Sequence, residues 1–156
     1  MKAVLQRVHY ARLSISGKEC AAIGPGLLVL LGVGKSDENG NDNDKALLER
    51  LARKTLQLRI FEDEQGRMNR SLMDVGGDCL IVSQFTLHAD ARKGLRPSFT
   101  GAAAPEAAER MYNCFVETCR RMAPDMRIHT GVFAADMQIE LLNDGPVTII
   151  LDTDDW

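Results

Sequence analysis

A short apolar run, Leu27–Val33, sets the tightest limit on the fold of this chain. It follows the chain-breaking residues Gly24–Gly26 and lacks the polar alternation of a strand with one face in water. Such a run is typical of a strand that is buried on both faces. The fold must cover this strand above and below, which requires layers packed around an interior sheet.

Further strands and two helices are predicted from residue periodicity. The strands are expected at Val4–Val8, Leu13–Ile15, Cys20–Ile23, Leu58–Phe61, Cys79–Phe85, Met126–His129, Met137–Leu142 and Val147–Leu151. One helix begins near Asp44, and the second runs from Pro105 to Pro124. Because strand and helix do not alternate regularly, a doubly wound nucleotide-binding sheet is not expected. We predict a mixed α/β fold: a layered β/β/α single domain over residues 1–152, with largely antiparallel sheets, two main helices on one side, and a short, loose acidic tail at residues 153–156.

The charge balance restricts the partners that the chain can have. It carries 19 basic and 22 acidic side chains, for a net charge of −3. This excludes a protein that coats nucleic acid with a broad basic face, but permits one that grips only a nucleic-acid end. The longest apolar run, Gly26–Val33, is far shorter than the ~20 residues of a membrane span. The segment Met1–Tyr10 has polar groups every few residues and no signal-peptide cleavage site, so we expect a cytoplasmic protein without a membrane partner.

The side chains that most often carry chemistry or bind metals are isolated in this sequence. They are the histidines His9, His88 and His129 and the cysteines Cys20, Cys79, Cys114 and Cys119. None belongs to a zinc, catalytic-triad or paired-cysteine pattern. We therefore expect structural or solvent-exposed histidines, reduced and mostly buried cysteines, and no metal ion or cofactor.

Two short segments have functional and structural interpretations that both stay open from the residues alone. Ser83–Leu87 ends a buried strand with three polar side chains, which either meet a ligand or satisfy backbone groups in a turn. Asn143–Thr148 contains Gly145 and Pro146, a compact dipeptide whose carbonyls can be exposed as acceptors. The alternative is an ordinary tight hairpin turn between the last two predicted strands.

These two segments together resemble the D-aminoacyl-tRNA deacylase family, cytoplasmic homodimers that hydrolyse the ester between a D-amino acid and tRNA. Matching segments occur in order from residue 1 to about 152, at Met1–Val8, Ile23–Leu30, Ser83–Leu87, Lys93–Phe99, Thr130–Phe133 and Asn143–Thr148. One departure is Ala134, where the family commonly has glycine. If that glycine has a positive φ, Ala134 costs about 1 kcal/mol or shifts the backbone near Met137.

The resemblance implies how the chirality of the substrate is selected. In the family the bond between Gly145 and Pro146 is cis, and the dipeptide of one subunit enters the pocket of the other with its carbonyls at the substrate's α-carbon. Arg7 holds the dipeptide by hydrogen bonds, and Met137 lies on the substrate side. Rigid backbone acceptors leave space only for hydrogen where an L side chain would project, so L-aminoacyl-tRNA is excluded and glycyl-tRNA is a substrate.

The resemblance also implies a catalytic floor made of Ser83, Gln84, Phe85 and Thr86, with the backbone N–H groups near Phe85 and Thr86 facing the ester carbonyl. The attacking group is either the Thr86 hydroxyl or a water assisted by the 2′-hydroxyl of the terminal adenosine. The sequence near Thr86 contains no general base, which favours water. Basic residues that follow this floor are expected to contact tRNA phosphates, or else to form a solvated loop: Arg92, Lys93 and Arg96.

The expected function is therefore a hydrolase that acts on the tRNA acceptor end carrying a D-amino acid or glycine, as a homodimer without a cofactor. Two alternatives use the same fold: a trans-editing enzyme for another mischarged tRNA, and a tRNA-end-binding dimer without catalysis. A third is a conventional hydrolase with Thr86 or Cys79 as its nucleophile.

Overall fold

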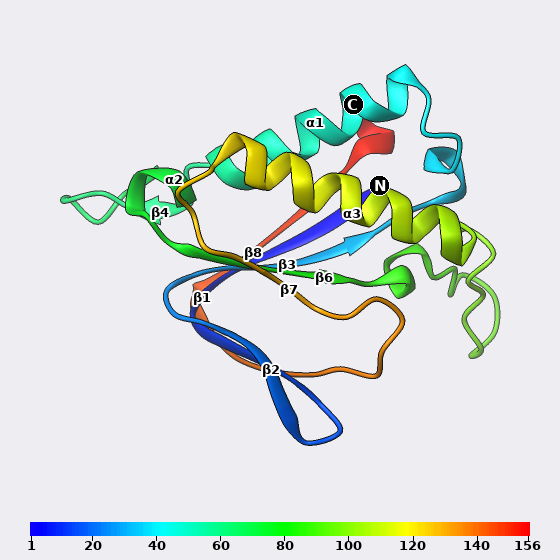
Figure 1. Ribbon diagram of the computed structural model, residues 1–156, viewed down its shortest axis with the longest axis horizontal. Helices are drawn as coiled ribbons and strands as arrows, with labels where there is room; N and C mark the ends of the chain where they lie inside the picture. The colour runs from blue at the N-terminus through cyan, green and yellow to red at the C-terminus, as the bar shows by residue number, and fades with distance from the viewer.

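The computed structural model describes all 156 residues and is built on one six-stranded mixed sheet (Figure 1). Its strands are β1 (Lys2–Ile15), β2 (Lys18–Ile23), β3 (Gly26–Gly32), β6 (Asp78–Ser83), β7 (Ile128–Thr130) and β8 (Gln138–Asp152). A separate two-stranded sheet contains β4 (Phe61–Glu62) and β5 (Met68–Arg70). The α-helices are α1 (Asp42–Gln57), α2 (Leu72–Val75) and α3 (Pro105–Met122), and the 3-10 helices are η1 (Lys35–Asp37), η2 (Phe85–His88) and η3 (Thr153–Asp155).

The strand order in the main sheet is β2-β1-β3-β6-β7. Strand β1 is long enough to pair with β2 and β3 in succession, and β8 pairs with it along nearly its whole length. Antiparallel pairs join β1 to β2, β3 and β8, whereas β3, β6 and β7 are parallel. Helices α1 and α3 lie side by side over one face of the sheet, and β2 lies below its other face with the adjoining parts of β1 and β8 (Figure 1). The mixed α/β single domain is confirmed, but its strand layers belong to one curled sheet, and α2 is a third, short helix.

Two apolar clusters occupy the two faces of the sheet. The cluster under the helices includes Val29 of β3 together with Leu51 and Phe115 of the helices. The smaller cluster includes Leu28 of β3 and Leu13 of β1. Strand β3 contributes alternate residues to both clusters, so the prediction of a strand buried on both faces is confirmed.

The helix termini follow from local sequence. Asn41 and Asp44 form a capping box at the start of α1: the Asp44 N–H donates to Asn41 Oδ1 (3.0 Å), and the Asn41 N–H donates to Asp44 Oδ2 (3.1 Å). Pro105 occupies the first turn of α3, where its missing N–H leaves no helical bond unmade. Both main helices therefore begin within two residues of their predicted starts.

The prediction of two strands joined by a hairpin turn at Asn143–Thr148 is wrong. Strand β8 is continuous from Gln138 to Asp152 and pairs with β1 on both sides of this segment. The pairing moves from Gln6–Thr148 to Val8–Asn143, so four residues of β8 stand opposite Arg7 alone. We call these residues, Asp144–Val147, the β8 bulge. A turn-forming sequence is thus accommodated inside a strand as an insertion.

The prediction of a loose tail at residues 153–156 is also wrong. Thr153 is buried, and its N–H donates to the Met1 carbonyl (2.9 Å). The Met1 amino group in turn donates to Thr153 Oγ1 (2.6 Å). The ring of Trp156 lies 4.7 Å from the Arg50 guanidinium of α1. These contacts hold the acidic segment against the domain.

Candidate functional site

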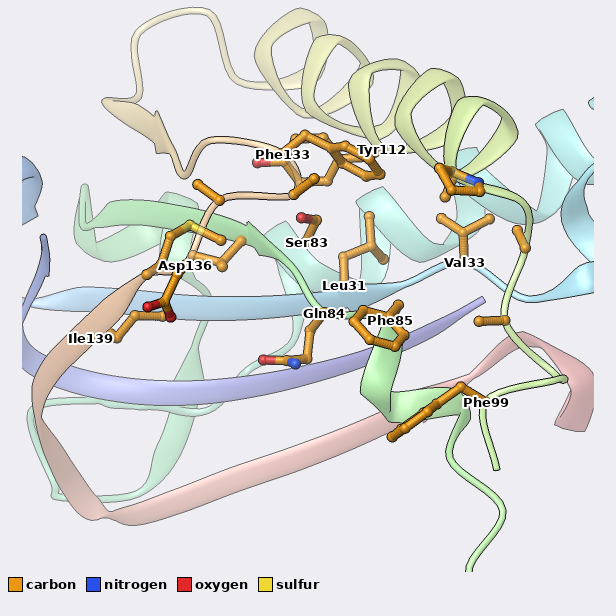
Figure 2. A pocket seen from close by; sticks show the side chains of 18 residues that line it. Leu31, Val33, Ser83, Gln84, Phe85, Phe99, Tyr112, Phe133, Asp136 and Ile139 are labelled. Carbon is orange, nitrogen blue, oxygen red and sulfur yellow. The ribbon is translucent and has the colours of Figure 1, made fainter. Parts of the chain in front are cut away.

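A cavity of about 600 Å³ opens between α3 and the ends of β3 and β6 (Figure 2). Ligand sites in sheets with parallel strands commonly lie beyond the carboxyl ends of those strands, and this cavity has the volume of a small-ligand site. Most of its lining is apolar, including Leu31, Tyr112 and Phe133. Its polar side chains near the strand ends are Ser83 and Gln84.

The floor of the cavity is the turn that follows β6. The strand ends at Ser83, two residues before the predicted end, and the chain then forms η2. The Gln84 N–H still donates to the Leu31 carbonyl of β3 (2.8 Å), while the Gln84 side-chain amide donates to the Thr86 hydroxyl. Ser83, Gln84 and Phe85 line the cavity, and Thr86 lies beside them on an exposed part of η2. The structure therefore brings together the four predicted floor residues.

Two glycines of the β3 end allow this turn to pack directly on the strand. A Cβ on Gly32 would lie 2.9 Å from the Gln84 carbonyl oxygen, and a Cβ on Gly34 would lie 2.7 Å from His88 Cε1. A Cβ at Gly32 would require the Gln84 backbone to shift, and a Cβ at Gly34 would require the His88 ring to move. His88 fills the space above them, which agrees with its predicted structural role. The sequence pattern did not reveal the two glycines as support for the site.

Tyr112 forms part of the cavity wall and has a fixed orientation. Its hydroxyl donates to the Ile81 carbonyl of β6 (2.8 Å), and its ring centroid lies 6.2 Å from that of Phe133. Burial raises the pKa of Tyr112 to about 12. The phenol therefore stays protonated near neutral pH and serves as a wall rather than as a base. In the sequence, Tyr112 follows the apolar spacing of this helix, which gives no sign of a cavity.

The loop between β7 and β8 carries Met137 into the cavity lining. A Cβ on Gly131 would lie 2.7 Å from Met137 Sδ, so the glycine makes room for this sulfur. Ala134, in the same loop, has a φ of 60°, in the left-handed region. The condition considered for this position, a positive φ, is therefore met, and Ala134 adopts it in place of glycine.

The predicted chiral-selection dipeptide lies in the β8 bulge. The bond between Gly145 and Pro146 is cis, and both residues are exposed. Arg7 is 4% exposed, and its Nη1 donates to the Ile60 carbonyl (2.6 Å). Its Nε lies 2.8 Å from Asp144 Oδ2, so the shorter of its two ion pairs is with the residue before the dipeptide; the other joins Nη2 to Glu62 Oε1 at 3.8 Å.

These predicted residues thus form two groups in one chain. Arg7 lies beside Gly145, since a Cβ on that glycine would be 3.1 Å from Arg7 Nη2. Gly145 and Pro146 are not among the residues that line the cavity of the same chain. The dipeptide and the Ser83–Thr86 floor therefore occupy different places on the surface.

The three basic residues that follow η2 are all exposed. The Arg92 guanidinium binds both carboxylate oxygens of Asp90 (2.9 and 2.6 Å) and holds the pKa of that carboxyl well below its usual range. Lys93 and Arg96 form no ion pair. Arg92 is therefore already engaged, and only the other two present unpaired positive charge.

Two further properties bear on the class of the site. Nowhere do three or more His, Cys, Asp or Glu side chains gather in a way that could hold a metal ion. None of the helices combines the length and apolar character that crossing a bilayer requires.

Comparison with known proteins assigns the family. Residues 4–152 match the family model described as D-Tyr-tRNA(Tyr) deacylase. The chain belongs to this family. As a member of it, the protein is a hydrolase that acts on the ester of aminoacyl-tRNA.

The individual relatives match this deacylase over nearly its whole length. A D-aminoacyl-tRNA deacylase of Thermosipho africanus is 49% identical over 153 residues, which cover 98% of this chain and 97% of the relative. The solved structure of a c-Myc DNA unwinding element binding protein superimposes with a TM-score of 0.87 and 44% identity, covering 97% of this chain and 98% of that one. A probable eukaryotic D-amino acid tRNA deacylase shares the fold, with a TM-score of 0.79 at 19% identity over 96% and 97% of the two chains.

Proposed function

We propose that this deacylase removes D-amino acids and glycine from tRNA and spares L-aminoacyl-tRNA. We also propose that it acts as a homodimer in which the β8 bulge of one subunit completes the cavity of the other. The observation that carries the proposal is the separation of the two groups of residues. A polar floor lies in the cavity, while a rigid backbone dipeptide is exposed on the bulge, outside the cavity of its own chain.

Backbone acceptors suit the selectivity that this function needs. The enzyme has to accept many side chains and yet distinguish mirror images at the α-carbon, which a side-chain pocket cannot do. Carbonyls of Gly145 and Pro146 directed at the substrate would bind its α-amino group and leave room only for hydrogen on one side. Exclusion by a wall that cannot relax exceeds the ~1–3 kcal/mol available from a methylene-sized difference. The buried Arg7 beneath the bulge supports this rigidity.

Strand β8 offers a surface for the second subunit. It pairs only with β1, so its outer edge has no partner strand in the chain. Its apolar residues Leu142 and Ile150, on either side of the bulge, are 49% and 71% exposed. Exposed apolar side chains along an unpaired edge support an interface that includes the bulge.

The chemistry requires orientation rather than a strong base. Water adds to the ester carbonyl carbon, the bond to the ribose oxygen breaks, and that oxygen takes a proton. Backbone N–H groups near Phe85 and Thr86 would stabilise the oxyanion, and the 2′-hydroxyl of the terminal adenosine would assist the water. The Thr86 hydroxyl accepts a hydrogen bond from Gln84, and no histidine or carboxylate bonds to it. This favours water over Thr86 as the nucleophile.

Cys79 is poorly placed to serve as a nucleophile. It is fully buried beneath the helices, and burial raises the pKa of its thiol well above the usual value. Both properties argue against the alternative of a cysteine hydrolase built on Cys79, and retained turnover in Cys79→Ala would exclude it.

The decisive experiment compares ester hydrolysis of D-tyrosyl-, L-tyrosyl- and glycyl-tRNA by the purified protein. We expect rapid loss of the D-ester, slower loss of the glycyl ester and no enzymatic loss of the L-ester. Hydrolysis of another mischarged tRNA in place of the D-ester would support the trans-editing alternative. Binding without ester loss would support the non-catalytic dimer.

A variant pair separates the two possible nucleophiles. If water attacks, Thr86→Ala retains measurable turnover and Thr86→Ser is close to the original enzyme. Complete loss in Thr86→Ala, with a covalent acyl-enzyme trapped in the original protein, would instead assign Thr86 as the nucleophile.

A further inference from the structure

We propose that Phe85 and Phe99 form a stacking platform for an unpaired RNA base, the one that precedes the aminoacylated nucleotide of the tRNA acceptor end. Lys93 and Arg96 would contact the phosphates beside it. This inference rests on the proposed function, because it needs the aminoacyl ester to occupy the cavity.

The two rings form a defined pair at the mouth of the cavity (Figure 2). Their centroids are 5.2 Å apart and their planes meet at 68°, an edge-to-face arrangement. Phe85 is 57% exposed and Phe99 is 38% exposed. Each ring holds the orientation of the other while apolar surface stays open to solvent. Apolar rings this exposed beside a functional cavity indicate a binding surface rather than part of the core.

A basic loop is attached rigidly to this pair. Asp90 and Ser98 form an antiparallel bridge with backbone bonds of 2.7 and 2.9 Å, which closes the exposed loop between them. Phe99 follows the bridge directly, so the loop closes beside this ring. Lys93 and Arg96 lie exposed in this loop without an ion pair. The loop therefore presents unpaired positive charge within a few residues of an exposed aromatic ring.

This combination matches the chemistry of single-stranded RNA recognition. Such RNA stacks its bases on aromatic rings while basic side chains follow its phosphates. A net charge of −3 argues against broad contact with the tRNA body, so binding has to be concentrated at the end. The nucleotide that carries the ester must reach the Ser83–Thr86 floor inside the cavity. The preceding nucleotide then lies at the mouth, where the two rings are.

The test measures kcat/KM for two esters, one without and one with the nucleotides that precede the terminal adenosine: D-tyrosyl-adenosine, and D-tyrosyl ester on the trinucleotide CCA. The variants are Phe99→Leu, which keeps an apolar side chain without a ring face, and Phe99→Trp, which keeps an aromatic face. Met68→Leu is the control, since Met68 is a 60% exposed apolar residue on β5.

We expect Phe99→Leu to lower kcat/KM for the trinucleotide ester about tenfold and to leave the adenosine ester within about twofold. Phe99→Trp should restore the trinucleotide rate, and Met68→Leu should change neither rate. Lys93→Gln with Arg96→Gln should flatten the salt dependence for the trinucleotide only. Equal losses on both esters would assign Phe99 a structural role and overturn the platform, as would no loss on either.

The proposed function is judged separately in the same experiment. The original enzyme's preference for the D- over the L-ester of adenosine does not need the preceding base that the platform would bind. A clear D preference together with an unresponsive Phe99→Leu variant would reject the platform alone. Absence of the D preference would reject the proposed function, and the inference with it.

Discussion

Arg7 Nε lies 2.8 Å from Asp144 Oδ2, and this ion pair joins β1 to the β8 bulge at the β1 residue that the bulge bypasses. The same guanidinium donates to the Ile60 carbonyl between α1 and β4. One buried side chain thus connects three segments that are distant in sequence. Arginine suits the position because its planar fork donates in several directions at once.

Replacement of Arg7 by methionine should lower the free energy of unfolding by about 3 kcal/mol, since it removes the donor to the Ile60 carbonyl and the buried partner of Asp144, which keeps only the exposed His9. Lys2→Met is the matched control, because the Lys2–Asp152 pair is partly exposed and should contribute less than about 1 kcal/mol. Urea denaturation of both variants measures the difference. Equal losses would show that the Arg7 network adds nothing beyond a surface pair.

Gly145→Ala should impair catalysis as well as stability. Gly145 has a φ of +117°, and its added Cβ would lie 2.7 Å from Val147 Cγ2. The bulge must shift to relieve this contact, and a displacement of about 1 Å in a positioning group costs on the order of 100-fold in rate. The assay is D-tyrosyl-tRNA hydrolysis.

Gly17→Ala provides the control for Gly145→Ala. Its φ is also positive (+75°), but nothing lies within 4 Å of the added Cβ. It should lose about 1 kcal/mol of stability from the backbone and keep its activity. Full activity in Gly145→Ala would show that the position of the bulge does not matter for catalysis.

Ala134→Gly should stabilise the protein by about 1 kcal/mol, because glycine adopts the observed φ of 60° without the Cβ penalty. Ala135→Gly is the control: its φ is not positive, so the added flexibility should be neutral or destabilising. Thermal and urea unfolding measure both effects. A loss of stability in Ala134→Gly would mean that the alanine methyl makes contacts that outweigh the strain.

Stability should fall steeply between about pH 9 and pH 12. Burial raises the pKa of Tyr112 and of Cys119 to about 12, whereas the unfolded chain loses these protons near their ordinary values. The stabilisation is complete below the unfolded pKa and is lost as the pH rises through the folded one. Tyr112→Phe and Cys119→Ala should each reduce the slope of unfolding free energy against pH in this window. An unchanged slope in both would contradict burial as its cause.

Local sequence predicted those parts of the fold in which the choice of residues depends directly on burial or on hydrogen bonding within the segment. The apolar run of β3 and the caps of α1 are examples, because burial on both faces and capping each impose a recognisable residue choice. The question of a positive φ at Ala134 arose from the resemblance to the family, not from periodicity. The four residues of the predicted floor, Ser83–Thr86, lie together because they are adjacent in the chain.

Features that depend on tertiary pairing were missed. Asn143–Pro146 has every local property of a turn, yet its pairing with β1 on both sides keeps the strand continuous. The η2 turn that follows β6 packs on Gly32, the last residue of β3, and on Gly34 just beyond it, both distant in sequence from Ser83. The sequence did not predict that Phe99 pairs with Phe85. The two residues are far apart in the chain, and the Asp90–Ser98 bridge brings them together. No single-segment pattern contains these relationships.

The β8 bulge also bears on how the protein stays in solution. An unpaired edge strand of this length is a template onto which other chains can add strand by strand. The insertion at Asp144–Val147 breaks the regular repeat of N–H and C=O groups along β8. An added strand could therefore pair with only a short stretch of β8 on either side of the bulge. A segment with the local sequence of a turn therefore acts as a barrier to fibrous self-association along the β8 edge of the sheet.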